Sequence, residues 1–387
     1  MNLTVNTAAP SGTVASTGAP PARASARLTF LDGLRGFAIL LMILNHTLRD
    51  WMDTGMGWTR YYLIYGTLIV GAALFLFLVG FCLPISYHRA PEQPGSRSFL
   101  KYLRRGAMLI GAGYLLNALV TPEQPLLSGG MLQTIGFSII VLGPVVPFLS
   151  RRWVRWTLLG LAAVSYFTFA WAFPALTRWS EAHPLMAKVF FNDFPPWPWI
   201  SVALIGLVLG WTWLEARARG EDQEIRFYLS IVVWSLVLVL AFLVWEWWSP
   251  SPTKPRFGFP RDFILNHHWT PRGTTTFLTL GGVGGLLAGM YWLMERRRFA
   301  LPWLVTLGQA ALMLYAVHQL IELTLLRHIL DLRFNNWLVY GGVALAFTVL
   351  LIYVGRAWVA LRPRVKALMF RPLARLMGTG PVRAGAE

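Results

Sequence analysis

The sequence predicts an all-α protein, a polytopic integral membrane bundle of about ten transmembrane helices with both termini on the cytoplasmic side. Three observations lead to this prediction. Of the 387 residues, 56% are hydrophobic and 13% are charged, whereas a soluble domain carries about a quarter charged residues. Several apolar runs reach the roughly 18 residues that mark a transmembrane helix. Lys and Arg are dense in alternate breaks between these runs, as in cytoplasmic loops.

The apolar runs divide the chain into three parts. Residues 1–25 are rich in Ala, Pro, Ser, Thr and Gly, which is typical of a disordered segment, and they contain no apolar core of a signal peptide. We expect a disordered cytoplasmic tail at 1–25, a transmembrane domain at 26–358 and a basic cytoplasmic tail at 359–387. The predicted spans are 31–48, 62–86, 104–120, 130–149, 156–175, 197–215, 227–248, 274–294, 301–325 and 336–356.

The positions of the basic residues predict the orientation. With the N-terminus inside and ten alternating spans, 23 Lys and Arg residues fall on the cytoplasmic side and ten on the outer side, while Arg35 lies within the first span. Short cytoplasmic loops carry such an excess. The net charge of +17 therefore indicates membrane topology, and we expect a multi-pass protein of the cell membrane without a nucleic-acid partner. A homo-oligomer is compatible with the sequence.

Two predicted outer loops, 176–196 and 249–273, are long and rich in Pro, Trp and Phe. Aromatic residues gather at membrane interfaces, so both loops fit an interfacial belt. They also fit an aromatic rim against which a sugar stacks. The sequence leaves both interpretations open.

No pattern predicts a metal site. The only cysteine, Cys82, lies in an apolar run, which excludes a disulfide framework and a cysteine-based zinc site. His267 and His268 follow Asp262 in the second long loop, but adjacent histidines cannot easily point at one ion. The HExxH spacing of zinc peptidases is absent. We therefore expect no metal.

The first predicted span carries ionisable residues at both ends of its apolar stretch. Asp32, Arg35 and His46 lie in FLDGLRGFAILLMILNHTLRDW at 30–51, with ten residues between the arginine and the histidine. Eleven helical steps of about 100° return to nearly the same face after a rise of roughly 16 Å. Asp32 can pair with Arg35 at a spacing of three, as in a helix-start ion pair with a snorkelling arginine. An ionisable group within a span, here His46, indicates function.

This layout is suited to moving an acyl group across a membrane from cytoplasmic acyl-CoA. A cation at the inner mouth would hold the phosphates of the donor. A neutral histidine further along would take the proton of an attacking hydroxyl or amine.

The Arg35-x10-His46 spacing within LDGLRGFAILLMILNH resembles the transmembrane acyltransferase superfamily, whose branches include the acyltransferase-3 proteins and the heparan-α-glucosaminide N-acetyltransferase-like proteins. Four further stretches resemble the second branch: ALFLFLVGFCL at 73–83, FLKYLRRGAMLIGAGYLLN at 99–117, GGMLQTIGFS at 129–138 and LGQAALMLYAVH at 307–318. The proline that usually follows the basic pair in acyltransferase-3 proteins is missing after Arg104 and Arg105.

The resemblance implies an acyl-CoA donor, acetyl-CoA in particular, that enters from the cytoplasm, and an acceptor glycan or lipid-linked sugar at the other side. It implies that His46 is the catalytic base, or a transient carrier of the acyl group. Arg35, with Asp32 as its partner, would either bind the CoA phosphates or support the catalytic site structurally.

Further candidates have two interpretations each. Lys101, Arg104 and Arg105 at the start of the third span either reflect membrane topology or bind CoA phosphates. The predicted substrate-binding residues are Asn45, Gln133, Tyr315, His318 and Glu322. The last three share one helical face, yet a buried histidine or amide also joins neighbouring helices.

A second function from another class remains open. A secondary transporter of a lipid or small anion could use His46, His318 and Glu322 as a proton relay, although corresponding broken helices in two halves are not visible. The nucleophile elbow of hydrolases, the Walker A run and the dinucleotide fingerprint are all missing. The leading prediction is a membrane acyltransferase with membrane lipid, acyl-CoA and the acceptor as its partners.

Overall fold

The computed structural model describes residues 28–53, 57–89, 95–122, 125–191, 194–248 and 275–376. Every regular element in these ranges is a helix, and an isolated bridge joins Met52 to Phe334. The fold class is therefore the predicted one. The predicted tail at 1–25, the loop at 249–273 and its residues Asp262, His267 and His268 lie outside the described ranges.

The helices follow one another in a simple order along the chain. They are α1 (Thr29–Trp51), α2 (Gly57–His88), α3 (Gly95–Val120), α4 (Met131–Leu142), the 3-10 helix η2 (Gly143–Ser150), α5 (Arg152–Ala182), α6 (Pro184–Phe190), α7 (Pro196–Ala218), α8 (Glu221–Trp248), α10 (Thr275–Tyr291), the π-helix η3 (Trp292–Arg296), α11 (Pro302–Gln309), α12 (Ala311–Gln319), the π-helix η4 (Leu320–Ile329) and α13 (Trp337–Leu376).

Eight of the described helices are long and apolar enough to cross a membrane, or nine if α11 and the helix that follows it form one span. The prediction was about ten. The difference is α3, whose first half carries the basic residues Arg97, Lys101, Arg104 and Arg105. α3 nevertheless packs along α4. The protein is a multi-pass membrane protein.

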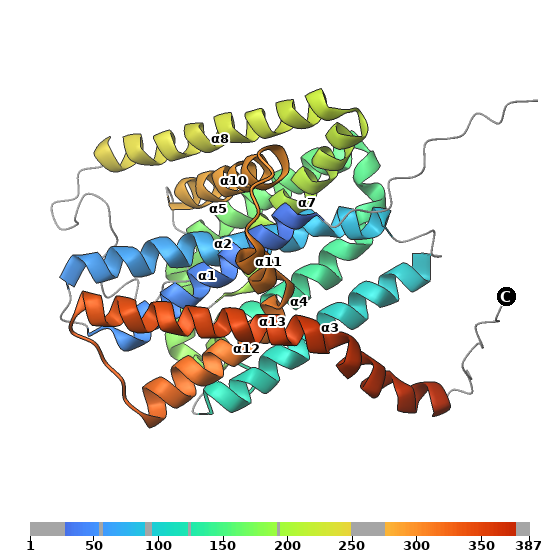
Figure 1. Cartoon of the computed structure of the whole chain (residues 1–387). Coiled ribbons are helices and arrows are strands. Elements are labelled where there is room, and N and C mark those ends of the chain that lie inside the picture. Colours follow the sequence, from blue (N-terminus) through green and yellow to red (C-terminus); the bar gives the residue numbers. More distant parts are fainter. Residues whose placement is uncertain are drawn as a thin grey trace, which may run out of the picture.

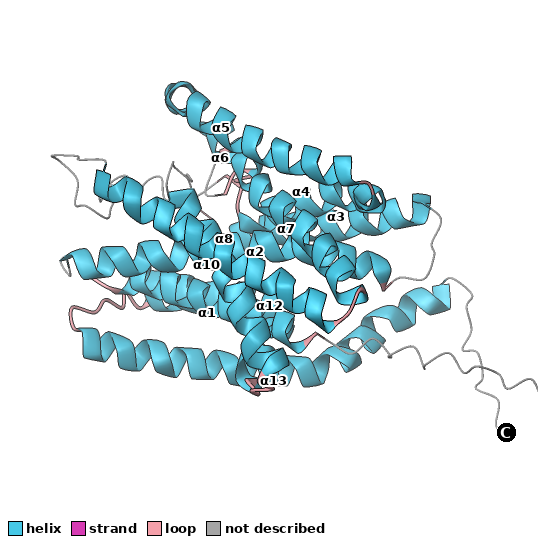
Figure 2. Ribbon diagram, turned by 90° about the horizontal axis from the view of Figure 1, so that it is seen from above, coloured by secondary structure: helices cyan, strands magenta, loops and turns pink. Residues whose placement is uncertain are grey.

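Helices α1, α2 and α7 form the centre of the bundle. α2 packs against α1 and α7, and α1 also packs against α11. Seen from above, α5 and α13 lie at opposite edges with the central helices between them (Figure 2). α1 begins and α13 ends toward the same end of the bundle (Figure 1), which is expected when the chain crosses the membrane an even number of times.

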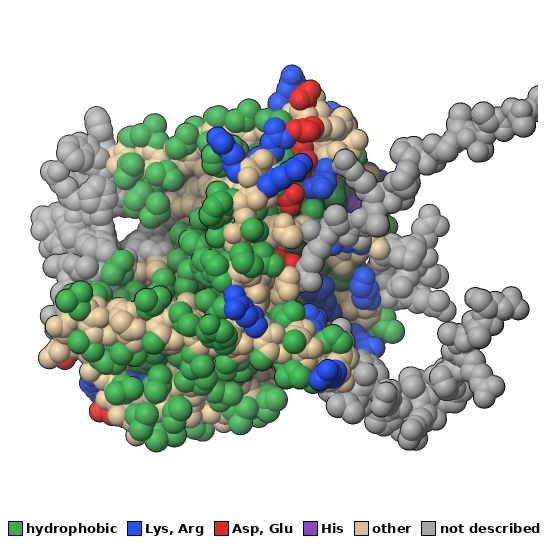
Figure 3. Space-filling model, viewed as in Figure 1, with side chains coloured by type: hydrophobic (Ala, Val, Ile, Leu, Met, Phe, Trp, Pro, Cys, Tyr) green, Lys and Arg blue, Asp and Glu red, His purple; other side chains and the backbone are tan. Residues whose placement is uncertain are grey.

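The outer helices present apolar side chains where lipid would lie. Trp171 of α5 is 85% exposed and Trp234 of α8 is 64% exposed. The face in Figure 3 is largely apolar, and most of its visible Lys and Arg side chains lie toward the end of the bundle at which α8 begins. This segregation fits an apolar belt with basic residues at one membrane surface.

The predicted span 301–325 is broken. α11 ends at Gln309, Ala310 leaves the helical conformation with φ −98° and ψ 9°, and α12 continues at an angle of 80° to α11. The helix then widens into η4 from Leu320. The π-helix is a rare conformation, and where it occurs within α-helices it often lies at a functional site. Both halves of the broken segment contact α1: α11 packs along it, and α12 and η4 contact it as well.

Two glycines let α11 and α1 touch through their backbones. A Cβ atom added to Gly308 would lie 1.8 Å from the carbonyl oxygen of Asp32, and one added to Gly36 would lie 1.9 Å from the carbonyl oxygen of Leu304. Small residues permit such close crossings between membrane helices. The contact fixes the start of the broken segment beside the Asp32–Arg35 turn.

Candidate functional site

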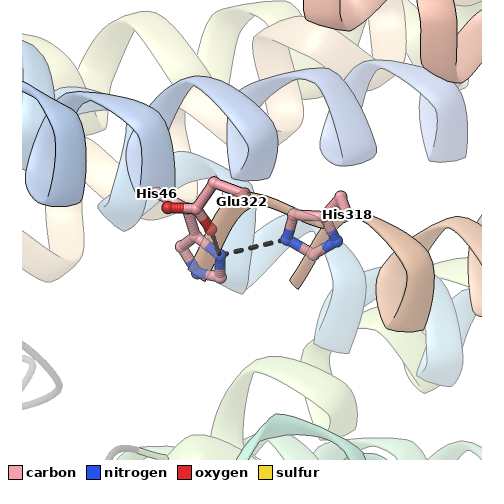
Figure 4. A group of neighbouring side chains, drawn as sticks. All are labelled: His46, His318 and Glu322. Atoms are coloured by element: carbon pink, nitrogen blue, oxygen red, sulfur yellow. Dashed lines mark hydrogen bonds and ion pairs between the residues drawn. The ribbon is translucent and has the colours of Figure 1, made fainter. Parts of the chain in front are cut away.

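His46 of α1 and His318 of α12 lie side by side in the interior. The Nδ1 atom of His46 is 3.0 Å from the Nε2 atom of His318, and the two rings stack with their centroids 5.1 Å apart and their planes at 26°. His318 is fully buried, and 16% of the His46 side chain is exposed. Figure 4 shows the pair with Glu322. Residues 272 positions apart therefore form one hydrogen-bonded pair.

The backbone of α12 determines where the protons of this pair lie. The Nδ1 atom of His318 is 2.9 Å from the carbonyl oxygen of Leu314. A carbonyl only accepts, so Nδ1 of His318 carries a hydrogen and, in the neutral ring, Nε2 carries the lone pair. His46 must then donate from Nδ1 to His318. In this tautomer the lone pair of His46 lies on Nε2, the position from which a neutral histidine acts as a base.

Glu322 completes the cluster from the first turn of η4. Its Oε2 atom is 3.9 Å from Nδ1 of His46, and the residue is 1% exposed. Neither carboxylate oxygen receives a hydrogen bond of ordinary geometry from an N–H or O–H donor of the described residues. The indole nitrogen of Trp51 donates to the backbone oxygen of Glu322 at 3.3 Å, which ties η4 to the end of α1.

Charged neighbours surround the Glu322 carboxylate. Arg49 binds both carboxylate oxygens of Asp50, each at 3.1 Å, and both members of this pair interact electrostatically with Glu322. Asp50 acts on Glu322 more strongly than Arg49 does, and its carboxyl lies close to that of Glu322. A carboxylate near His46 would stabilise a positive charge on the ring.

At the other end of the stripe, Arg35 makes the predicted ion pair. Its Nη1 atom is 3.1 Å from Oδ1 of Asp32, and its Nη2 atom donates to Sγ of Cys82 at 3.0 Å. The two bonds hold the guanidinium between α1 and α2. The arginine is therefore positioned at a cavity mouth by two different helices.

Two cavities meet at Arg35. The larger, with a volume of about 600 Å³, is polar, and its charged and hydroxyl lining residues are Asp32, Arg35, Ser86, Arg89, Lys101 and Arg105. The smaller, of about 210 Å³, is mainly apolar, with Phe75, Leu78, Met131 and Ile135 among its lining residues. Arg35, Cys82 and Arg105 line both. We name the first the basic vestibule and the second the apolar chamber.

The apolar chamber reaches Tyr315, a neighbour of the histidine pair, but neither His46 nor His318 lines it. Tyr315 lines the chamber, and its ring meets that of His318 edge to face with the centroids 5.9 Å apart. The order through the bundle is therefore the basic vestibule, Arg35, the apolar chamber, Tyr315 and His318.

Other predicted site residues have local partners. The amide nitrogen of Asn45 donates to the backbone oxygen of Ile64 at 2.7 Å, and so joins α1 to α2. The amide nitrogen of Gln133 donates to the backbone oxygen of Ser128 at 3.2 Å. Arg104 is exposed and lines neither cavity. The structure therefore brings Arg35, Lys101 and Arg105 together at one end, and His46, Tyr315, His318 and Glu322 at the other.

Sequence reasoning did not select three lining residues of α2 and its end. Cys82, Ser86 and Arg89 all line the basic vestibule. They are spaced by four and three positions, so they share one face of a helix. That spacing was a usable signal, but the apolar context of Cys82 and the loop position of Arg89 concealed it.

A comparison with protein families adds independent support. Residues 27–247 match the model of the family described as heparan-alpha-glucosaminide N-acetyltransferase, catalytic. The match includes the Arg35–His46 stripe and the basic vestibule, whereas His318 and Glu322 follow it. No curated protein sequence matches the chain. Since the match covers more than half of the 387 residues, the chain belongs to the family of heparan-α-glucosaminide N-acetyltransferase catalytic domains, and its function is of the membrane N-acetyltransferase type.

Proposed function

We propose that the protein transfers an acyl group, in particular acetyl, from cytoplasmic acyl-CoA to an acceptor at the other side of the cell membrane, with His46 as general base. The observation that carries this proposal is a pair of cavities that share Arg35: the basic vestibule, and the apolar chamber lined by Tyr315, which lies beside His318. The acceptor is a hydroxyl or amine of a glycan or lipid-linked sugar.

The basic vestibule suits the nucleotide end of the donor. Arg35, Arg89, Lys101 and Arg105 line it together with the single acidic residue Asp32. Arginine and lysine form strong charge-assisted hydrogen bonds to phosphate oxygens, and CoA carries several phosphate groups. Arg35 is oriented toward this task because Asp32 and Cys82 hold its guanidinium.

The apolar chamber suits the thioester end of the donor. Its wall is formed mainly by aliphatic and aromatic side chains of α2, α3, α4 and α12. An apolar wall excludes water from the thioester and so limits hydrolysis, which competes with transfer. The narrow arm of acyl-CoA would lie along this wall with its acyl group toward Tyr315.

His46 supplies the proton chemistry. Its Nε2 atom takes the proton of the acceptor hydroxyl or amine while the acceptor oxygen or nitrogen attacks the thioester carbonyl carbon. The carbon–sulfur bond then breaks, the electron pair leaves with the CoA sulfur, and the proton held by His46 passes to that thiolate. Glu322, 3.9 Å from the ring, stabilises the imidazolium that exists between these transfers.

The family supports an amine acceptor, because its description names an amino sugar derivative and N-acetyl transfer. The proton-relay alternative, a secondary transporter, would also use His46, His318 and Glu322, which do lie together. It does not account for a basic vestibule that opens into an apolar chamber. We therefore favour acyl transfer.

The test compares wild-type protein with His46→Ala in acetyl transfer. Purified protein in nanodiscs receives labelled acetyl-CoA and a set of amino sugars and glycans as acceptors. Loss of a general base lowers the rate by about 10² to 10⁴-fold, so we expect a loss of at least about a hundredfold. His183→Ala, which replaces an exposed histidine on α5's C-terminal end, is the matched control. Equal transfer by wild type and His46→Ala would refute the role of His46.

A further inference from the structure

Three potential metal ligands converge in the interior, although no metal site was expected from the sequence. They are Nδ1 of His46, Nε2 of His318 and a carboxylate oxygen of Glu322, and all lie within 4.8 Å of one another. The two printed edges of this triangle are 3.0 Å between the histidines and 3.9 Å from His46 to Glu322. The three side chains come from α1, α12 and η4.

These distances fit a transition-metal ion. For edges of 3.0 and 3.9 Å and a third edge of at most 4.8 Å, the point equidistant from the three atoms lies roughly 2.0 to 2.4 Å from each. Zinc–nitrogen and zinc–oxygen bonds are about 2.0 to 2.2 Å long. Shifts of a few tenths of an ångström would therefore bring all three atoms to bonding distance.

The surroundings of the ligands support the same conclusion. The second nitrogen of His318 donates to the backbone oxygen of Leu314, an arrangement that typically orients a metal-bound histidine. The Glu322 carboxylate is 1% exposed, and neither of its oxygens receives a hydrogen bond of ordinary geometry from an N–H or O–H donor of the described residues, although the Asp50 carboxyl lies close. A buried carboxylate without such a donor needs an explanation. In Figure 4 this carboxylate points at the His46 ring.

We propose that His46, His318 and Glu322 bind one divalent transition-metal ion, with Zn²⁺ as the ion best matched to two imidazoles and a carboxylate. The ion takes the place of the hydrogen that His46 shares with His318. A neutral His46 bound to the metal through Nδ1 carries its hydrogen on Nε2, and that atom no longer accepts a proton. The bound ion would therefore inhibit transfer, a consequence that rests on the proposed function, whereas binding itself does not.

Two charged neighbours influence the affinity of the three-residue site for a metal cation. Arg49 opposes a cation near Glu322, and Asp50 favours it. Asp50 acts on Glu322 more strongly than Arg49 does, so this bidentate pair as a whole does not oppose a cation. The Glu322 carboxylate is then the charged ligand on which binding depends most.

Binding is measured without any activity assay. The full chain, purified with a histidine-free tag and stripped with a chelator, is titrated with Co²⁺ alone, and its visible absorption is followed. Zn²⁺ is then added, and the metal content per chain is determined by mass spectrometry. We expect one Co²⁺ per chain with a tetrahedral or five-coordinate spectrum, and its displacement by one Zn²⁺.

Variants locate the ion. Glu322→Gln and His318→Gln should each weaken binding more than about tenfold, while His183→Ala should bind like the wild type. Thermal unfolding of the metal-free proteins identifies a variant that has lost its fold, and in that case the other variant decides. Absence of binding to the wild type, or equal binding by the wild type and both cluster variants, would overturn the proposal.

The inhibitory consequence has its own measurement. Zn²⁺ should lower acetyl transfer by the wild type at least about tenfold, and chelator should restore it. If metal-free protein shows no transfer at all, the proposed function fails while the binding result stands. If transfer is present and bound Zn²⁺ does not change its rate, then the metal site exists, but the ion does not replace the hydrogen that His46 shares with His318. That result would refute the inhibition.

Discussion

At the scale of single residues, spacing rules predicted short-range contacts, whereas the long-range grouping of His46, His318 and Glu322 was considered only as the proton relay of a transporter. The Asp32–Arg35 ion pair followed from a spacing of three and is present at 3.1 Å. The contact between His46 and His318 bridges 272 positions, and no spacing rule reaches that far. Asn45 looked like a substrate ligand, yet its amide reaches a backbone oxygen of α2, because the choice of partner depends on how two helices cross.

The hydrogen-bond direction within the histidine pair can be tested with two substitutions of His318. Gln places an amide oxygen near the position of Nε2 and can still accept from His46, whereas Asn reproduces only the position of Nδ1. We expect His318→Asn to lower kcat about 10- to 100-fold and His318→Gln to retain more activity. KM for acetyl-CoA should stay the same in both, because His318 does not line the basic vestibule.

The comparison of Gln with Asn separates positioning from packing. Both replacements are amides in the same buried place, so a purely structural role would lower stability and kcat for both. Thermal unfolding of the two variants supplies the control. Equal losses of kcat would mean that His318 does not set the tautomer of His46.

At the scale of helices, the apolar runs located the spans, but the shape of one of them was not predictable. The run 301–325 contains no proline between Pro302 and its end, so nothing in it marks a break. The 80° bend at Ala310 instead accompanies the contact of Gly308 with the backbone of α1. Tertiary packing therefore decides where this helix stops, and the turn that follows brings His318 and Glu322 to His46.

The backbone contact at Gly308 predicts a large effect of one methyl group. In Gly308→Ala the new Cβ would meet the carbonyl oxygen of Asp32 at 1.8 Å, and neither backbone can yield easily. Overpacking of this kind costs about 1 to 3 kcal/mol. We expect a lower midpoint of thermal unfolding, together with reduced transfer, since α11, and with it the following α12, would move away from α1.

Gly341→Ala is the matched control for this substitution. A Cβ atom at Gly341 of α13 would meet nothing within 4 Å, and alanine is favoured over glycine in helices by roughly 0.5 to 1 kcal/mol. The control variant should unfold at the wild-type temperature or slightly above it. A similar loss of stability in both variants would show that the α1–α11 crossing is not as tight as described.

At the scale of the whole molecule, basic residues gather toward one end of the apolar bundle (Figure 3), and two cavities adjoin at Arg35. The positive-inside pattern indicated which end carries the cations. It could not indicate that Arg35, Arg89, Lys101 and Arg105, from three segments of the chain, would line a single vestibule. A resemblance of short motifs located Arg35 and His46, but the two cavities that share Arg35 exist only in the packed helices.

The shared boundary of the two cavities offers a direct test of donor binding, because Cys82 lies there and is the only cysteine in the sequence. A bound acyl-CoA would pass this thiol on its way from the basic vestibule to the apolar chamber. CoA should therefore slow the labelling of Cys82 by a small maleimide about tenfold or more at saturation, as followed by mass spectrometry of the intact protein.

Three controls accompany this measurement. A CoA analogue that lacks the thiol group should protect Cys82 equally, because the analogue cannot react with the maleimide or form a disulfide with Cys82. Arg105→Gln should shift the protecting concentration upward by about tenfold, since a lost charge-assisted hydrogen bond costs about 1.5 to 3 kcal/mol, whereas Arg104→Gln should not, because Arg104 lines neither cavity. A transporter of an unrelated solute would leave the labelling rate unchanged at every CoA concentration, and that result would exclude the proposed donor path.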